Sequence, residues 1–427
     1  MTIGQAEGGG MQIKTILNRV QKFKSFVYGA VRWVEAGTVP ALEVELRPRV
    51  HSRGICSGCG RDRPGYDRLP RRCFEFVPLW GMKVFLVYAP RRVDCPGCGV
   101  KVEQMPWAAG KCPLTTAYAW FLAGWAKRLS WKEVAEVFHM SWDAVFGAVA
   151  MAVAWGRAHL DLSGIHALGI DEIAWQRGHR YLTLVYQIDS HCRRLLWIGE
   201  KRTVKTLLRF FRWFGQTRSR GLRFICSDLW KPYLKVIAKK AGQAVHVLDR
   251  FHIMAHMSKA IDEVRAQEVR ELKAQGEEPV LTKTRWLLLK RPERLSEKQH
   301  GHLAQLLRHN LKTVRSYLLK EDFQFFWTYT SPYWAGCFLD QWCTRTLQSK
   351  LEPMKRVVRM LKGHRELLLN WFRAKGQLSS GVVEGFNTKA KLTTRKAFGF
   401  RTYHALEVAL YHTLGALPEP EFTHRFF

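Results

Sequence analysis

The pattern of apolar and polar positions between residues 165 and 248 predicts one continuous α/β region. Apolar runs bounded by turn residues indicate buried strands, and apolar positions three or four apart indicate helices. The expected strands are a first one ending at Asp171 and then residues 180–188, 194–198, 222–227 and 244–248, and the expected helices are residues 203–214 and 232–240. The order β-β-β-α-β-α-β is typical of a mixed five-stranded sheet covered by helices, so we predict an α/β fold.

The chain on either side of this region has other patterns. Residues 251–376 contain few strand signals and are largely helical, and two more helices are expected over 384–396 and 403–414. Before the sheet, residues 11–110 contain short strand-like runs such as 42–46 and 82–88, which alternate as half-buried strands do.

Residues 113–158 are expected to be helical and to contain a helix-turn-helix. Ser130 and Glu133 form a capping box, in which each side chain satisfies a free amide at a helix start. Helices over 131–138 and 142–154, separated by a short turn and a second N-cap at Ser141, fit the helix-turn-helix pattern. Trp142 is the residue expected to contact DNA there. An ordinary helical hairpin packed on its apolar residues would give the same local pattern.

Four cysteines form two Cys-x-x-Cys pairs, each followed by glycine: Cys56 with Cys59, and Cys95 with Cys98. Two such pairs are typical of a closed tetrahedral zinc site, although 36 positions separate Cys59 from Cys95. The alternative is two unrelated reduced pairs. Cys73 and Cys112 are expected to be buried free thiols.

The charge of the chain indicates a polyanionic partner. Its 427 residues include 68 Lys and Arg against 36 Asp and Glu, a formal net charge of +32. A surplus this large repels itself in a compact protein unless DNA or RNA is bound. No apolar run approaches the length of a membrane span and no signal peptide is visible, so we expect a cytoplasmic protein that does not bind membranes.

Three acidic residues from separate elements are the candidate catalytic groups. Asp171 and Asp228 follow expected strands, and Glu384 lies on a basic helix near the C-terminus. Carboxylate oxygens suit Mg²⁺, and two such ions assist phosphoryl transfer. A lone aspartate after a strand is more often a loop cap. Glu172, on the opposite side of its strand from Asp171, and Asp189, in a turn, are substitutes in principle.

The helix of Glu384 also carries Asn387, Lys391 and Arg395, which share one face at helical spacing and are the candidate DNA-binding residues. A solvated charged stripe is the usual origin of such a pattern. Near the fifth strand, three histidines at positions 246, 252 and 256 flank Asp249. We expect the histidines to be structural or to support the catalytic edge of the sheet, with Asp249 a reserve ligand.

Four blocks of this sequence resemble the IS-L-three family of bacterial insertion-sequence transposases, a group of the DDE transposases. They are the paired cysteines, Gly169-Ile-Asp-Glu172, Ser227-Asp228 through Tyr233 with Leu248-Asp-Arg-Phe-His252, and Val383-Glu-Gly-Phe-Asn387 through Arg395-Lys-Ala-Phe-Gly-Phe-Arg401. The resemblance covers roughly residues 11 to 415. It implies a ribonuclease-H-like core with Asp171, Asp228 and Glu384 as its metal-binding triad. One departure is Ser380, where some DDE transposases carry arginine four residues before the glutamate.

The resemblance also implies a domain order and an activity. The domains are a disordered extension (1–10), a zinc-binding DNA-binding domain (11–112), a helix-turn-helix domain (113–160), the first part of the core (161–256), a helical insertion (257–376) and the C-terminal part of the core (377–427). Zinc is structural, and two Mg²⁺ ions, replaceable by Mn²⁺, serve cleavage and strand transfer. The partners are double-stranded terminal inverted repeats and target DNA, bound by a nucleoid-associated homodimer. A DNA-binding repressor with an inactive core and a structure-selective nuclease are the alternatives.

Overall fold

The computed structural model describes residues 13–421 except 37–38, 177, 277–280, 282–283, 291, 310, 375–380 and 398. The chain divides into two compact units. The first runs to Leu160 and includes the segment that begins at Leu417, and the second is Asp161–Ala416. The expected N-terminal extension, residues 1–10, lies outside the described residues.

The first unit begins with a helix and a set of antiparallel and parallel strands. They are α1 (Ile13–Val20), β1 (Phe26–Ala36), β2 (Val39–Pro48), β3 (Gly54–Ile55), β4 (Asp62–Arg63), β5 (Gly65–Arg68), β6 (Arg72–Leu79), β7 (Met82–Tyr88), β8 (Arg91–Cys95) and β9 (Gly99–Val102). The main sheet has the order β1-β2-β7-β6, and two smaller sheets pair β3 with β4 and β5 with β8 and β9. The main sheet packs on Trp107, which is 1% exposed and meets Phe26 and Tyr88 edge-on.

Three helices complete the first unit: α2 (Thr116–Trp125), α3 (Trp131–Val137) and α4 (Trp142–Ala158). The capping box of Ser130 and Glu133 is present, and the Ser141 hydroxyl accepts a hydrogen bond from the Ala144 amide. The axes of α3 and α4 differ by 118° at the break between them. Within the described chain, no single helix is long and apolar enough to cross a membrane, and α3 with α4 reach that length and composition only as this bent pair.

The second unit is built on a mixed five-stranded sheet. Its elements are β10 (Ala167–Gln176), β11 (Arg180–Ile188), β12 (Arg193–Glu200), α5 (Val204–Phe214), α6 (Gln216–Arg220), β13 (Phe224–Ser227), α7 (Lys231–Lys240) and β14 (Val245–Leu248). The strand order is β12-β11-β10-β13-β14; the first three strands are antiparallel, and β10, β13 and β14 run parallel. The mixed α/β sheet predicted from the sequence is therefore confirmed, with the short helix α6 in addition.

The prediction that the first strand ends at Asp171 is wrong. β10 continues to Gln176 because its residues beyond Asp171 pair with the long antiparallel neighbour β11. The parallel neighbour β13 ends earlier, since its last residue, Ser227, pairs with Ile170. Asp171 thus lies inside its own strand but at the edge of the parallel part of the sheet.

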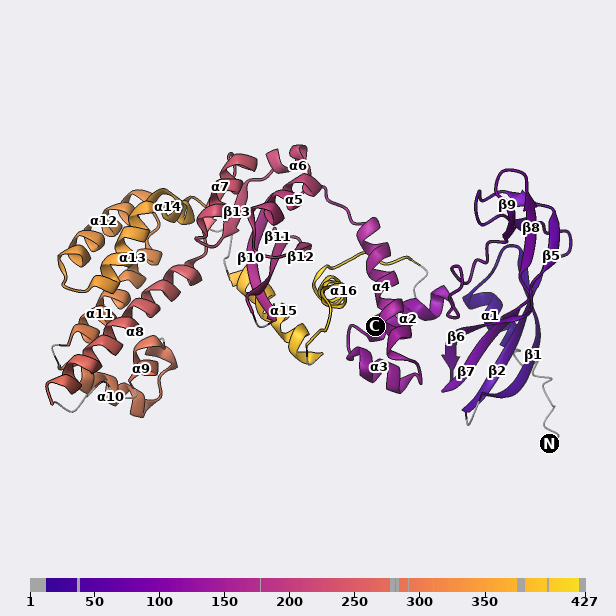
Figure 1. Ribbon diagram of the computed structural model, residues 1–427, viewed down its shortest axis with the longest axis horizontal. Helices are drawn as coiled ribbons and strands as arrows, with labels where there is room; N and C mark the ends of the chain where they lie inside the picture. Colours follow the sequence, from indigo (N-terminus) through magenta and orange to yellow (C-terminus); the bar gives the residue numbers. More distant parts are fainter. Residues whose placement is uncertain are drawn as a thin grey trace, which may run out of the picture. The chain divides into compact units, whose positions relative to one another are not determined.

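Helices cover both faces of this sheet (Figure 1). Leu168 and Ile170 point to the face where α5 and α7 pack. On the other face lie α15 (Gly381–Lys396) and α16 (Tyr403–Leu414). There Tyr186 of β11 stacks on Phe386 at a ring distance of 4.8 Å. The C-terminal helices are thus part of the sheet's core although about two hundred residues separate them from β10.

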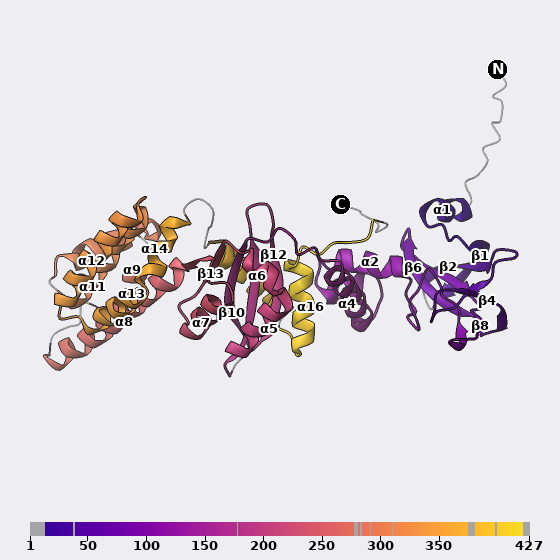
Figure 2. The ribbon, with the colours of Figure 1, turned by 90° about the horizontal axis from the view of Figure 1, so that it is seen from above.

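The helices between β14 and α15 form a bundle with one core of their own, and α8 runs along it (Figures 1 and 2). They are α8 (Arg250–Ala274), α9 (Arg285–Leu289), η1 (Pro292–Arg294), α10 (Glu297–Leu307), α11 (Lys312–Gln324), η2 (Phe325–Thr328), α12 (Pro332–Gln348), α13 (Glu352–Gly363) and α14 (Arg365–Arg373). The buried Glu268 of α8 accepts hydrogen bonds from the Lys312 and Thr313 amides, which caps α11. The bundle joins the sheet through α14, whose Asn370 amide donates to the His246 carbonyl of β14.

Candidate active site

Three aspartates lie in one row at the edge of the sheet. Ile170, Ser227 and Leu248 are register partners across the parallel strands β10, β13 and β14. The next residue in each case is an aspartate: Asp171, Asp228 and Asp249. Because β13 and β14 end where β10 leaves the parallel part of the sheet, three separate stretches of sequence bring an aspartate to the same edge of the sheet.

Asp171 is 8% exposed and is held from two sides. One carboxylate oxygen accepts the Glu172 amide at 2.7 Å, and the other accepts a hydrogen bond from the side-chain amide of Asn387 on α15. The Asn387 oxygen in turn accepts the buried Tyr186 hydroxyl at 2.9 Å. This chain of hydrogen bonds fixes the carboxylate of Asp171 relative to α15.

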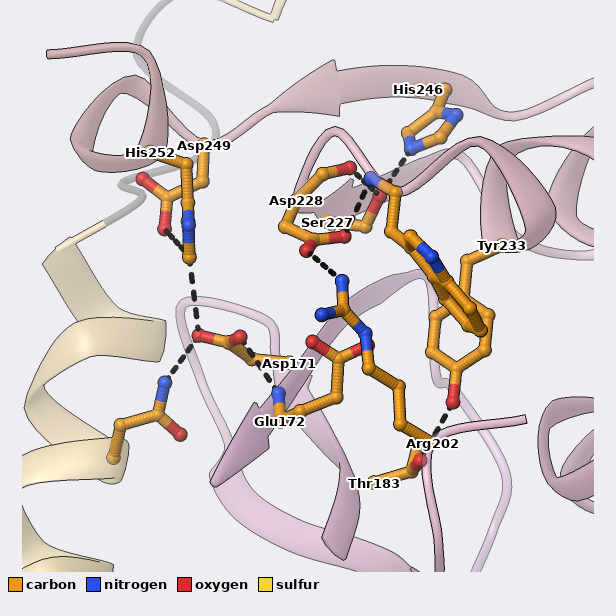
Figure 3. Close-up of polar contacts among 12 residues, drawn as sticks. Asp171, Glu172, Thr183, Arg202, Ser227, Asp228, Tyr233, His246, Asp249 and His252 are labelled. Atoms are coloured by element: carbon orange, nitrogen blue, oxygen red, sulfur yellow. Dashed lines mark hydrogen bonds and ion pairs between the residues drawn. The ribbon is translucent and has the colours of Figure 1, made fainter. Parts of the chain in front are cut away.

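Asp249 and His252 complete a cluster with Asp171 (Figure 3). Each of the three offers a ligand atom, and these atoms lie within 4.8 Å of one another. His252 Nε2 is 3.8 Å from Asp171 and 4.0 Å from Asp249, and the Asp171 carboxylate raises the pKa of His252 to about 9. Burial raises the pKa of Asp249 to about 6, although the Phe251 amide opposes it. His252, expected from the sequence to be structural or to support this edge of the sheet, therefore faces the candidate site.

Asp228 is held in another direction, by Arg202 (Figure 3). The Arg202 guanidinium lies 2.8 Å from the Asp228 carboxylate and 3.1 Å from Glu172, and its Cζ atom lies 4.5 Å from the centre of the Trp230 ring. Burial, with the charge of Asp228, raises the pKa of Glu172 to about 8. Glu172 does lie on the opposite side of β10 from Asp171, as its position in the strand predicts.

Glu384 is half-buried on α15, and its charge contributes to the raised pKa of Asp249. The helix comes close to β10 because position 169 is glycine. A Cβ there would lie 2.5 Å from the side chain of Val383, so a larger residue would push α15 and Glu384 away. The structure therefore brings Glu384 to the same edge as the aspartates, and among the described residues of this edge the group whose ligand atoms lie close enough to share an ion is Asp171, Asp249 and His252.

The three candidate DNA-binding residues of α15 differ in their surroundings. Lys391 and Arg395 are exposed, whereas Asn387 is 8% exposed and uses both ends of its amide on protein groups. The structure thus gives Asn387 a place beside Asp171 and leaves the two cations on the surface. Ser380, which stands where some DDE transposases carry arginine, lies outside the described residues.

The four paired cysteines of the first unit form one cluster, with sulfur atoms within 4.8 Å of one another. The Cys59 and Cys95 sulfurs are 3.6 Å apart, close to the ~3.8 Å expected between thiolates around a tetrahedral zinc with bonds of ~2.3 Å. The glycines after Cys59 and Cys98 have φ of 68° and 70°, which turns each knuckle in a conformation that favours glycine. The donor set and its spacing fit zinc.

Cys73 and Cys112 are exposed, so the prediction that they are buried is wrong. Cys73 lies on the outward side of β6, where strand alternation exposes every second residue, and Cys112 lies in a loop. Trp142 at the start of α4 is 43% exposed and stacks on Phe146 with an interplanar angle of 9°.

Comparison with known proteins identifies the family. The sequence model of a family of transposases matches residues 168–410, which make up more than half of the chain. The chain belongs to the IS-L-three family of DDE transposases. It is 28% identical over 364 residues to the transposase for insertion sequence element IS1001 of Bordetella parapertussis, covering 84% of this chain and 88% of that protein. It is 29% identical over 396 residues to the transposase for IS1557 of Mycobacterium tuberculosis, covering 87% and 88%.

The matched region of this transposase contains the whole aspartate row and Glu384. One group at the site, Arg202 between Glu172 and Asp228, was not found from the sequence, and His252 was expected only to be structural or to support this edge of the sheet. Arg202 follows β12, so only its position after a strand that ends at the same sheet edge could have indicated it. His252 lies three residues after Asp249 at the start of α8, and that helical spacing was available as a signal.

Proposed function

We propose that this transposase cleaves DNA at the ends of an insertion sequence and joins the freed 3′ ends to target DNA by a DDE mechanism. The observation that supports the proposal most is the row of carboxylates at the edge of the parallel part of the sheet. The strand order β12-β11-β10-β13-β14 supports a ribonuclease-H-like core, in which such carboxylates hold metal. The family of the chain supports the substrate.

In this proposal, Asp171, Asp228 and Glu384 hold two Mg²⁺ ions, which Mn²⁺ can replace. The residues present fit such ions, because hard cations take oxygen ligands and carboxylates from three elements meet at one edge. When bound, the ions stabilise charge on the attacking and leaving oxygens of the phosphodiester. Asn387 orients the carboxylate of Asp171, and the packing of Val383 on Gly169 fixes the position of Glu384. Asp249 and His252 are further donors at the same edge.

Sequence-specific recognition is assigned in this proposal to the first unit. The cysteine cluster holds structural zinc, and α3 with α4 serve as the helix-turn-helix that reads the terminal inverted repeats. The angle of 118° between these helices supports this role, since helix-turn-helix pairs cross at about 90–120°. Trp142 and the exposed Lys391 and Arg395 contact DNA. A homodimer brings the two ends together.

A strand-transfer assay with a matched control tests the proposal. The full chain and Mg²⁺ are mixed with labelled DNA that carries the inverted repeat flanking the gene and with a supercoiled plasmid. Asp171→Asn should abolish cleavage and joining. Asp189→Asn is the control, because Asp189 is equally buried but accepts hydrogen bonds from the His166 amide and from Gln187 at another part of the sheet.

Three results would overturn the proposal in different ways. Specific binding without cleavage or joining in Mg²⁺ or Mn²⁺ would indicate a repressor with an inactive core. Hydrolysis without joined products would indicate a nuclease. Equal loss of activity in both variants would show that the sheet needs buried carboxylates for folding and that Asp171 has no special place in catalysis.

A further inference from the structure

A basic groove of about 1160 Å³ lies between α5, α6 and α7, on the face of the sheet away from α15. Six cationic side chains line it, and its lining contains no acidic residue: Arg212, Arg220, Lys231, Lys235, Lys239 and Lys240. All six are exposed. Among the described residues, none of the six forms an ion pair with a carboxylate of the chain.

The charge around the groove is uneven even for this basic protein. Residues 201–243 contain twelve Lys and Arg but a single acidic residue, Asp228, which Arg202 already neutralises. Surface cations are commonly balanced by nearby carboxylates, as Lys132 is by Glu136 on α3. Six unbalanced cations facing one hollow repel one another, and a bound polyanion relieves that repulsion.

The cations of α7 are arranged as a line that starts at the candidate active site. Lys231, Lys235 and Lys239 are four residues apart and share one helical face. Lys231 comes three residues after Asp228, so the line begins at the edge where the aspartates lie. The ten residues of α7 extend ~15 Å, which matches about four base-pair steps of ~3.4 Å.

We propose that this groove binds the phosphate backbone of the target duplex, an inference that rests on the proposed strand-transfer function. Four of the six cations are lysines, which contact phosphate as point charges, and Val204 and Phe211 contribute apolar surface between them. Backbone contacts of this kind position DNA without selecting sequence. An insertion sequence needs sequence recognition at its own ends, whereas its target requires only capture. A cationic line leading from the catalytic edge therefore fits the target.

The test removes three charges at the end of the groove far from Asp228, with Lys235, Lys239 and Lys240 all changed to Gln in the full chain. Its control changes Lys298, Arg308 and Lys350 to Gln, three exposed cations of the helical bundle. With pre-cleaved transposon ends, the groove variant should join at least ten-fold less target and require more target for half-maximal joining. The control should join as the unchanged protein does.

A second measurement does not depend on catalysis. Affinity for a random-sequence duplex is measured against salt concentration in an Asp171→Asn background. If the three lysines contact phosphates, the slope of log affinity against log salt should fall by about 2.7, since each contact contributes ~0.9. The control triple should leave the slope unchanged.

The results separate the inference from the function on which it rests. If the unchanged protein neither cleaves nor joins, the proposed function fails, while the salt slope still reports whether the groove binds duplex. Normal joining and an unchanged slope in the groove variant would overturn the inference. So would an equal loss of end binding and joining, which would assign the groove to the transposon end. Tighter binding of single-stranded DNA or RNA than of duplex at the groove would also contradict it.

Discussion

Replacing Asn387 with leucine tests whether this residue orients Asp171 or contacts DNA. Leucine is close to asparagine in size but has no polar atoms, so it removes two hydrogen bonds without leaving a large cavity. One is the bond to the Asp171 carboxylate, and the other is the bond from the hydroxyl of Tyr186, a residue that is 0% exposed. Both partners would remain buried with unmet hydrogen-bonding capacity.

The expected cost follows from these two bonds. A hydrogen bond to a charged group contributes ~1.5–3 kcal/mol, and a neutral one ~0.5–1.5 kcal/mol. Asn387→Leu should therefore lower the free energy of unfolding by about 2–4 kcal/mol, measured by urea denaturation with far-ultraviolet circular dichroism. Tyr186→Phe, which removes one hydroxyl, should cost about 1 kcal/mol. In the double variant the costs should sum to less than the two single effects, because both remove the same Tyr186–Asn387 bond.

The same variants separate the two roles in binding. If Asn387 only orients Asp171, the affinity for terminal-repeat DNA in the absence of metal should be unchanged in Asn387→Leu, while joining falls. A variant as stable as the unchanged protein but with weaker DNA binding would refute the reasoning. That result would return Asn387 to the exposed DNA-binding face that the sequence predicts.

Three further predictions concern charge and metal. Arg202→Gln should tighten Mn²⁺ binding about five-fold or more, because the partly exposed ion pair between Arg202 and Asp228, of about 1 kcal/mol, no longer competes with the metal ion for Asp228. An electron paramagnetic resonance titration measures this affinity, and unchanged or weaker Mn²⁺ binding would contradict the prediction. Burial lowers the pKa of His246 to about 4, below its usual 6.5. Between pH 6.5 and 4, His246 is protonated in the unfolded chain but not in the folded one, so about 3 kcal/mol of folding stability should be lost as the pH falls through this range. In acid denaturation, His246→Gln should show a weaker dependence of stability on pH. Cys95→Ser should abolish zinc binding, measured by atomic emission, and lower the melting temperature, whereas Cys73→Ser should retain one zinc per chain.

The sheet was predictable because its strands are short apolar runs between clear turn signals. Residues 180–188 and 403–414 form a strand and a helix with the predicted bounds, and the capping box of Ser130 places the start of α3. The end of β10 was not predictable, because it depends on how far β11 extends beside it. Local sequence does not contain that information.

The candidate site was predictable only in part. Motifs around Asp171, Asp228 and Glu384 indicate carboxylates, but the direction of each side chain depends on partners distant in the chain. Arg202 holds Asp228 from a position 26 residues away, and Asn387 reaches Asp171 across 216 residues. The burial of Asn387 likewise follows from the close packing of α15 on Gly169. Helical spacing alone predicts that Asn387 lies on the same exposed face as Lys391 and Arg395.

The packing of α15 on β10 also sets when, during synthesis, the site can first exist. Asn387 is made 216 residues after Asp171, and ribosomes add about 5–20 residues per second, so about ten to forty seconds pass between the two. Late in that interval the nascent chain contains residues 1–160 and the sheet strands but neither Glu384 nor the helix that orients Asp171. A polypeptide whose translation stops before residue 381 should therefore be able to hold DNA without cutting it.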